Sequence, residues 1–175
     1  EDFPLIEFEL LLGDYKEIER WVEDGQVDFG FLSGDVSASI ETIFVEEDRL
    51  LAVIPSTHPL AQESVFPMQA LNKSPFMLLE KGESDVISAI FEEHSIQPMV
   101  HFKTWDDYAI MSMVENELGI SILPELILKR IPYDVVVKEL EMPAYRSIYI
   151  GMRERKSLSI AAKQFLTYLQ YRHGE

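Results

Sequence analysis

Strand-like and helix-like hydrophobic periods alternate along this chain, and that alternation constrains its fold most. Residues 5–12 show the two-residue period of a strand with one wetter face. A helical pattern then begins at Asp14, with Glu17 completing a capping-box pair, and residues 27–32 form a short apolar strand. A strand–helix–strand order within about 28 residues predicts two parallel strands joined by a right-handed crossover.

A second series of the same kind follows a proline-containing stretch. Further strands are expected at 76–79, 99–102, 120–123, 135–140 and 148–152. Ser84, and either Asp106 or Asp107, are placed to cap the helices between them, and Ser159 to cap a last helix. The first of these helices should have Ile87, Ile90 and Phe91 on its inner face, and the second should carry Tyr108, Met111 and Val114.

The predicted fold class is therefore α/β, with two lobes that each contain a mostly parallel sheet flanked by helices. Lobe I is expected at 1–52 plus 147–175 and lobe II at 53–146. Crossing strands near 49–54 and 146–152 join the lobes, and the last helix returns to the first lobe. This arrangement predicts a cleft between the lobes, where strand carboxyl ends and helix amino ends converge.

Charge and composition exclude several classes of protein. The 175 residues contain no cysteine, which excludes disulfides and thiolate chemistry. Lys and Arg number 15 against 31 Asp and Glu, a net charge of −16, and residues 1–48 hold two cations against fifteen acids. Such a surface repels phosphate backbones, so this chain alone is not expected to bind DNA. No apolar run approaches the roughly 20 residues of a membrane span, and a cytoplasmic protein without a membrane partner is expected.

Searches for catalytic patterns return little. The four histidines lack metal-ligand spacing, and there is no nucleophile elbow, P-loop or dinucleotide fingerprint. Helix capping explains Asp106–Asp107 better than catalysis does, and the acidic run 46–48 reads as a solvated turn. We therefore expect no enzyme activity, no metal and no cofactor.

Four residues are better candidates for binding a small molecule. Gly13 precedes a helix start, where free N–H groups and the helix dipole favour an anion. Ser33 ends a strand with a hydroxyl group, while Thr104 and Trp105 supply a hydroxyl and an aromatic wall before another helix. Ordinary turn chemistry is the alternative interpretation of each residue, and their convergence on one predicted cleft favours binding.

Five blocks of sequence occur in the order and spacing of a known family. They are 12–13 with 25–31 (LG, GQVDFGF), 41–61 ending in PSTHPLA, 75–80 (PFMLLE), 114–124 ending in GISILP, and 161–169 (AAKQFLTYL). Over essentially its whole length the chain resembles the effector-binding domain of LysR-type transcriptional regulators. The resemblance implies a fold like type 2 periplasmic binding proteins, with two lobes around an effector cleft.

The resemblance also implies which residues line that cleft. By analogy, the ligand-lining positions fall near Ser33, Pro55, Leu79, Glu80, Lys81, Gly82, Thr104 and Trp105. Gly13 and Pro124 complete the predicted effector site. The family's domain normally begins with a strand and a helix before the block at Phe3-Pro4, and neither is in this chain.

The missing strand normally lies between the two strands predicted at 5–12 and 27–32. The chain could pair these strands directly, borrow a strand from another copy, or leave the lobe partly open. The half-polar strand at 5–12 suits an edge position.

The predicted function is the effector-sensing and oligomerisation domain of a bacterial LysR-type DNA-binding regulator. A small molecule, expected to be a carboxylate or another anion, would bind in the cleft and shift the lobes between states. DNA would be contacted only through an absent winged helix-turn-helix domain. The family analogy implies a homodimer or tetramer that pairs the helix near 15–23 with the helix near 85–94 of another copy. The alternative is a solute-binding protein of a transport system, which an upstream helix-turn-helix or signal peptide would distinguish.

Overall fold

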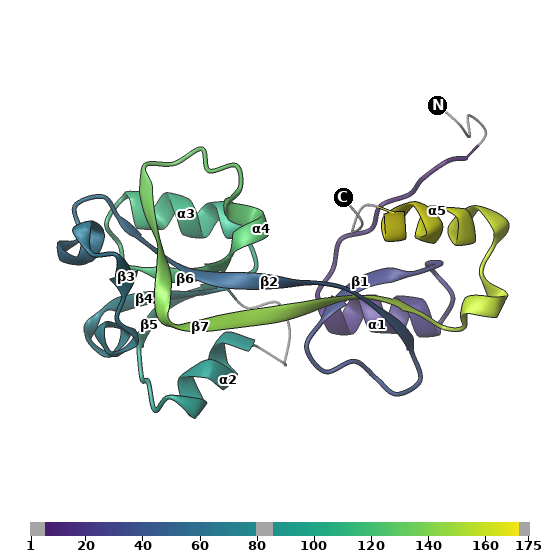
Figure 1. Cartoon of the computed structure of the whole chain (residues 1–175), viewed down its shortest axis with the longest axis horizontal. Coiled ribbons are helices and arrows are strands. Elements are labelled where there is room, and N and C mark those ends of the chain that lie inside the picture. Colours follow the sequence, from purple (N-terminus) through teal and green to yellow (C-terminus); the bar gives the residue numbers. More distant parts are fainter. Residues whose placement is uncertain (1–5, 80–85, 172–175) are drawn as a thin grey trace. The chain divides into compact units, whose positions relative to one another are not determined.

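A computed structural model of the chain describes residues 6–79 and 86–171, and its backbone forms two compact units (Figure 1). Unit 1 consists of Glu1–Val45 and Ile148–Glu175, and unit 2 is Glu46–Ser147. Each unit combines helices with strands, so the α/β class predicted from the sequence is confirmed.

The helices and strands have the following bounds. The α-helices are α1 (Tyr15–Glu23), α2 (Val86–Glu93), α3 (Asp107–Glu115), α4 (Glu125–Leu128) and α5 (Ile160–Tyr171). The strands are β1 (Gly30–Ser33), β2 (Glu41–Pro55), β3 (Val65–Phe66), β4 (Pro75–Leu79), β5 (Met99–Thr104), β6 (Ser121–Pro124) and β7 (Val135–Met152). Three short 3₁₀ helices complete the list: η1 (Pro59–Gln62), η2 (Met68–Lys73) and η3 (Arg155–Ser157).

The two longest strands, β2 and β7, each pass from one unit into the other (Figure 1). They lie side by side in a sheet of order β1-β7-β2-β6, and β3 pairs with β7. The predicted strands at 135–140 and 148–152 are in fact one strand, and the crossing strand predicted at 49–54 begins earlier, at Glu41. The prediction left 41–48 and 141–147 outside the strands because their side chains show no strand-like pattern. Backbone pairing with neighbouring strands keeps these two stretches extended.

The N-terminal part of unit 1 differs most from the prediction. Residues 6–14 belong to no strand, so the strand expected at 5–12 is wrong over its described part. No backbone hydrogen bond joins residues 6–13 to another part of the described chain, and β1 has only β7 as a neighbour. The segment and β1 therefore do not pair directly, and the parallel βαβ unit expected there does not form.

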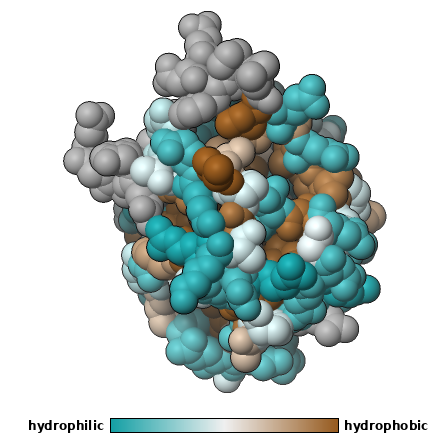
Figure 2. Space-filling model, turned by 90° about the vertical axis from the view of Figure 1, so that its right-hand side faces the viewer, coloured by the Kyte–Doolittle hydropathy of each residue, from teal (hydrophilic) through white to brown (hydrophobic). Residues whose placement is uncertain are grey.

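Side-chain packing nevertheless holds this segment against unit 1. The centroid of the Phe8 ring lies 5.7 Å from the centroid of the Phe165 ring on α5. The ring of Phe29 stacks on the same Phe165 ring, with 5.2 Å between the centroids. Leu10 and Leu12 are each about four-fifths exposed, which leaves apolar side chains in water. Figure 2 shows this side of the molecule, where hydrophobic patches interrupt a hydrophilic surface.

Unit 2 contains the parallel pairing predicted from the sequence. β4 and β5 are parallel, and Phe76 of β4 forms a parallel bridge to Ile120, just before β6. The predicted inner face of α2, Ile87, Ile90 and Phe91, is buried. On α3, which carries the three residues predicted for it, Met111 and Val114 are buried and Tyr108 is 53% exposed.

Helix starts were predicted correctly where the structure describes them. Asp14 and Glu17 form the expected capping box at α1. Asp106, rather than Asp107, caps α3: its side chain accepts hydrogen bonds from Tyr108 N and Ala109 N. Ser159 caps α5 by accepting from Ala162 N. The predicted cap at Ser84 lies outside the described residues.

Candidate functional site

The carboxyl ends of the unit 2 strands bring three predicted site residues to one edge. Leu79 is paired with Thr104 at the ends of β4 and β5. β6 runs parallel beside β4 and ends at Pro124, which pairs with Leu50 of β2. The carboxyl ends of parallel strands meet at one edge of a sheet, so Leu79, Thr104 and Pro124 share that edge.

Exposed polar and aromatic groups follow this edge where β5 leads into α3. Thr104 Oγ1 accepts a hydrogen bond of 3.1 Å from Asp106 N, which leaves its O–H free to donate. Trp105 is 73% exposed, and Tyr108, three residues later on α3, is 53% exposed. A hydroxyl donor and two accessible aromatic faces at a helix start suit a small polar ligand.

Of the other predicted residues of unit 2, Pro55 does not join this edge. Pro55 lies five residues beyond Leu50, at the far end of β2, about 16 Å along the strand at a rise of about 3.3 Å per residue. Glu80, Lys81 and Gly82 lie outside the described residues.

In unit 1 the predicted residue Ser33 has an unusual environment. It ends β1, pairs with Ile148 of β7 and is only 5% exposed. Its Oγ atom is buried and has no hydrogen-bond partner among the described residues. Leaving a buried hydroxyl unpaired costs about 1–3 kcal/mol. Among the described residues, this buried hydroxyl is therefore a candidate contact for a bound polar group.

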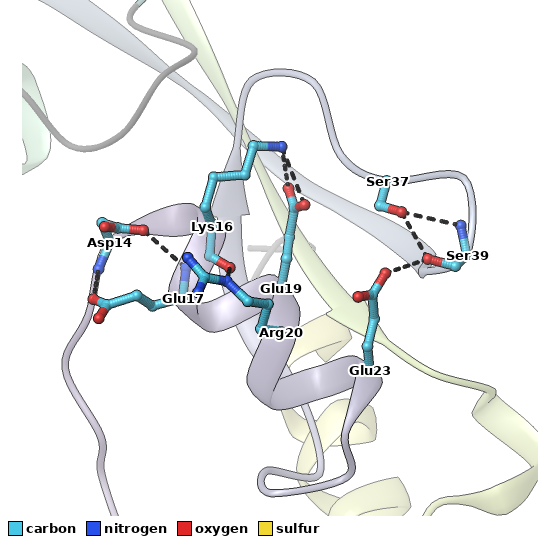
Figure 3. A network of polar contacts seen from close by, with 8 residues as sticks. All are labelled: Asp14, Lys16, Glu17, Glu19, Arg20, Glu23, Ser37 and Ser39. Atoms are coloured by element: carbon cyan, nitrogen blue, oxygen red, sulfur yellow. Dashed lines mark hydrogen bonds and ion pairs between the residues drawn. The ribbon is translucent and has the colours of Figure 1, made fainter.

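Gly13 has a packing role that the sequence did not reveal. A Cβ atom at Gly13 would stand 2.5 Å from the Trp21 ring, so any larger residue there requires the ring to move. The N–H groups of Asp14 and Glu17 are already used by the capping box, at 3.0 and 2.8 Å (Figure 3). The helix start therefore has fewer free donors for an anion than its sequence indicated.

Polar groups around α1 are also engaged with one another. The Lys16 ammonium contacts the buried carboxylate of Glu19 at 3.2 Å, and Ser39 donates to Glu23 from the loop after β1 (Figure 3). The Lys16–Glu19 contact lies within the helix, and the Ser39–Glu23 contact ties the helix to that loop.

Sequence reasoning missed the charged residues where β2 enters unit 2. Asp48 is 2% exposed and accepts from Arg146 Nη2 at 2.7 Å, so the solvated turn expected at 46–48 is wrong. Its neighbour Arg49 contacts both Glu125 and Glu139, and its hydrogen bonds lower the pKa of the Glu125 carboxyl. Asp48 and Arg146 are 98 residues apart in sequence, so no local pattern could pair them.

The described ranges 6–79 and 86–171 contain neither a candidate metal site nor a candidate membrane-spanning helix. No cluster of three or more His, Asp or Glu side chains is arranged to hold a metal ion. No helix there is long and apolar enough to cross a membrane.

Comparison with protein families identifies the fold. The sequence model of one protein family, described as the LysR substrate binding domain, matches residues 1–173. The chain therefore belongs to the LysR substrate-binding domain family.

Curated relatives are transcription regulators. The uncharacterized HTH-type transcriptional regulator YvbU of Bacillus subtilis is 26% identical over 168 residues, which is 95% of this chain and 57% of the relative. The transcriptional dual regulator GltC of the same organism is 24% identical over 97% of this chain and 58% of its own length. The chain thus spans less than three-fifths of these two relatives. The matches favour a regulator over the transport alternative.

Solved structures confirm the two-lobe fold expected from the sequence. The CcmR regulatory domain of Synechocystis PCC6803, in complex with 2-PG, superposes with a TM-score of 0.85 at 24% identity, covering 96% of this chain and 84% of that one. The effector binding domain of QuiR, in complex with shikimate, gives a TM-score of 0.78 at 24% identity, covering 90% and 77%.

Proposed function

We propose that this chain is the effector-sensing domain of a LysR-type transcriptional regulator and that Ser33 contacts the effector. The family match supports the sensing role, and the buried, unpaired Ser33 hydroxyl is the observation that supports the site. Thr104 and Trp105 contribute from the edge of unit 2. Effector binding at these groups shifts the population of conformations that the regulator reads.

The effector class that fits these groups is a small carboxylate or another small anion. Hydroxyl donors such as Ser33 and Thr104 hydrogen-bond well to carboxylate oxygens. A chain with a net charge of −16 attracts no anion at long range, so fixed local donors must provide the affinity. The carboxylate shikimate bound to QuiR supports this class.

Three parts of the proposal rest on family analogy. The effector is placed between the lobes, DNA is contacted through a domain outside this chain, and the regulator works in the cytoplasm. No catalytic step is part of the proposed role.

The test is ligand-induced thermal stabilisation measured with shikimate, 2-PG, inorganic phosphate, sulfate and acetate. Ser33→Ala removes an unpaired hydroxyl, so the free protein should keep or slightly raise its Tm. With the ligand that stabilises the parent chain, the same variant should lose most of the shift, because a bound polar group loses its partner.

A matched control is Ser64→Ala, at an exposed serine of unit 2. It should leave both the Tm and the ligand shift unchanged. A Ser33→Ala protein with a clearly lowered Tm and an unchanged ligand shift would assign Ser33 a structural role and refute the proposed site.

Self-association is the second part of the proposed role, and β5 is its proposed surface. β5 follows α2, one of the two helices predicted to pair, and within the described ranges β4 is the only strand paired with it. Met99, Val100 and Phe102 are 39–49% exposed on this edge strand. An open strand edge with exposed apolar side chains is a surface on which another chain can pair.

The proposed occupant is residues 6–12 of a second copy. That segment follows a drawn-out course outside any helix or strand (Figure 1), exposes Phe8 and Leu10, and carries the acidic residues Glu7 and Glu9. β5 carries Lys103, whose positive charge complements these carboxylates. A two-fold dimer would use each surface twice.

Sedimentation velocity tests this pairing. Phe102→Asp should weaken self-association by at least about tenfold, since a charge would enter an apolar contact. Tyr145→Asp is the control, because Tyr145 has the same 46% exposure and lies on β7. Equal effects of the two variants, or a strict monomer at high concentration, would count against the β5 surface.

A further inference from the structure

The two crossing strands are joined by charged side chains immediately beside the boundary between the units. Asp48 lies on β2, two residues after the unit 2 sequence begins, and Arg146 lies on β7, one residue before it ends. The guanidinium of Arg146 donates to Asp48 Oδ2 through Nε at 3.0 Å and through Nη2 at 2.7 Å.

The Asp48 carboxylate also holds a third element. Its Oδ1 atom accepts a hydrogen bond of 3.0 Å from Leu126 N in α4. α4 follows β6 directly, and Pro124 of β6 pairs with Leu50 of β2. One buried carboxylate therefore links β2, β7 and α4, and both its oxygens are engaged.

The next residue of β2 repeats this linkage at the surface. Arg49 forms two hydrogen bonds with Glu125 of α4, at 2.9 and 3.0 Å, and a third with Glu139 of β7, at 2.8 Å. Neighbouring residues on a strand point to opposite faces, so the buried and the exposed linkages lie on opposite faces of β2. β7, which carries both Glu139 and Arg146, is bent along its length (Figure 1).

We propose that the Asp48–Arg146–Leu126 joint anchors both crossing strands to unit 2 and confines bending between the units to Glu46–Glu47 and Ser147. A buried ion pair gives little net stability compared with apolar packing, but it has a narrow geometric optimum. Movement of β2 past β7 at this point would leave a charge buried and unpaired. The strands therefore bend where this restraint ends, on the unit 1 side of the joint.

The alternative is that the joint only stabilises unit 2 as a whole. Amide hydrogen exchange separates the two, because it reports opening residue by residue. In the parent chain, the protection of backbone amides against hydrogen exchange should rise sharply from Glu47 to Asp48. It should fall again from Arg146 to Ser147. The same level of protection on both sides of these positions would refute the proposal.

The variant Asp48→Asn preserves shape but removes the charge. Exchange at 48–52 and 144–146 should accelerate at least about tenfold more than exchange in α3, which serves as the reference for the stability of unit 2. Arg49→Gln is the matched control, since it breaks the exposed linkage on the adjacent residue and should change exchange in these segments much less. Equal acceleration in α3 and in the crossing strands would overturn the proposal.

A second variant keeps the test decisive if Asp48→Asn does not fold. Arg146→Lys retains the positive charge but loses the two-pronged donor geometry. It should also accelerate exchange selectively at 48–52 and 144–146. Exchange at the parent rate in those segments would show that the geometry of the joint does not restrain the strands.

Discussion

Ser121 Oγ donates a hydrogen bond of 2.7 Å to the backbone carbonyl of Met77, and both residues are fully buried. This bond joins β6 to β4 in the centre of unit 2, next to backbone bonds between Met77 N and Ile120 O and between Ile120 N and Pro75 O. The strands that form the candidate edge are thus held together by side-chain as well as backbone contacts.

Replacing this serine should weaken unit 2 without touching the candidate site. Ser121→Ala leaves the Met77 carbonyl without its side-chain partner and should lower the free energy of unfolding by about 1–3 kcal/mol. Urea denaturation measures the change. Ser64→Ala, at an exposed position, should change it by less than about 0.5 kcal/mol. A fully stable Ser121→Ala chain would show that this bond contributes nothing.

The α1 capping box offers a second prediction. Asp14→Ala removes the acceptor for Glu17 N and should cost about 0.5–2 kcal/mol of stability, whereas Asp14→Ser keeps an acceptor and should cost less. Chemical denaturation followed by circular dichroism measures both variants. Equal losses in the two would contradict a capping role for this side chain.

Acidic pH should destabilise the turn at His58. Burial lowers the pKa of this imidazole below its ordinary value of 6.5, and its Nδ1 accepts a hydrogen bond from Leu60 N. The unfolded chain then binds a proton more readily than the folded chain. Stability is therefore full above about pH 6.5 and falls as pH drops toward the lowered pKa.

The variant His58→Asn provides the comparison, because its side-chain oxygen can accept the same bond without titrating. Thermal stability measured between pH 5 and pH 8 should depend less on pH in the variant than in the parent chain. Parallel pH profiles would exclude His58 as a source of the dependence.

The chain by itself should not bind duplex DNA at physiological salt. Its net charge of −16 repels the phosphate backbone, and counterion release cannot compensate without basic contacts. A fluorescence-anisotropy titration with labelled duplex should show no saturable change. A gel-shift band formed with this chain alone would refute the prediction.

Features of the fold that depend on residues close in sequence could be predicted. Features that depend on contacts with distant parts of the chain could not. The caps at Asp14 and Asp106 depend on bonds within three residues, so their pattern is visible in sequence. The alternating segment 6–12 has the side-chain pattern of a strand, but a strand needs a neighbour to hydrogen-bond with, and none is present among the described residues.

The residues of the candidate site also differ in whether the sequence could predict them. Thr104 and Pro124 could be assigned to one edge because parallel strand ends meet there, which follows from the order of elements. The unpaired state of the Ser33 hydroxyl depends on everything packed around it, so only the structure reveals it. Asp48 and Arg146 carried no signal, because an acidic run has the same sequence whether it is solvated or paired.

Unit 1 is assembled from both ends of the described chain, which has a consequence for its biosynthesis. Its first part, Glu1–Val45, emerges from the ribosome before all of unit 2, while β7 and α5 complete it last. Synthesis of the intervening residues takes roughly 5–20 s at about 5–20 residues per second. During that interval Phe8, which packs on Phe165 in the finished unit, has no partner and is available to a nascent-chain chaperone.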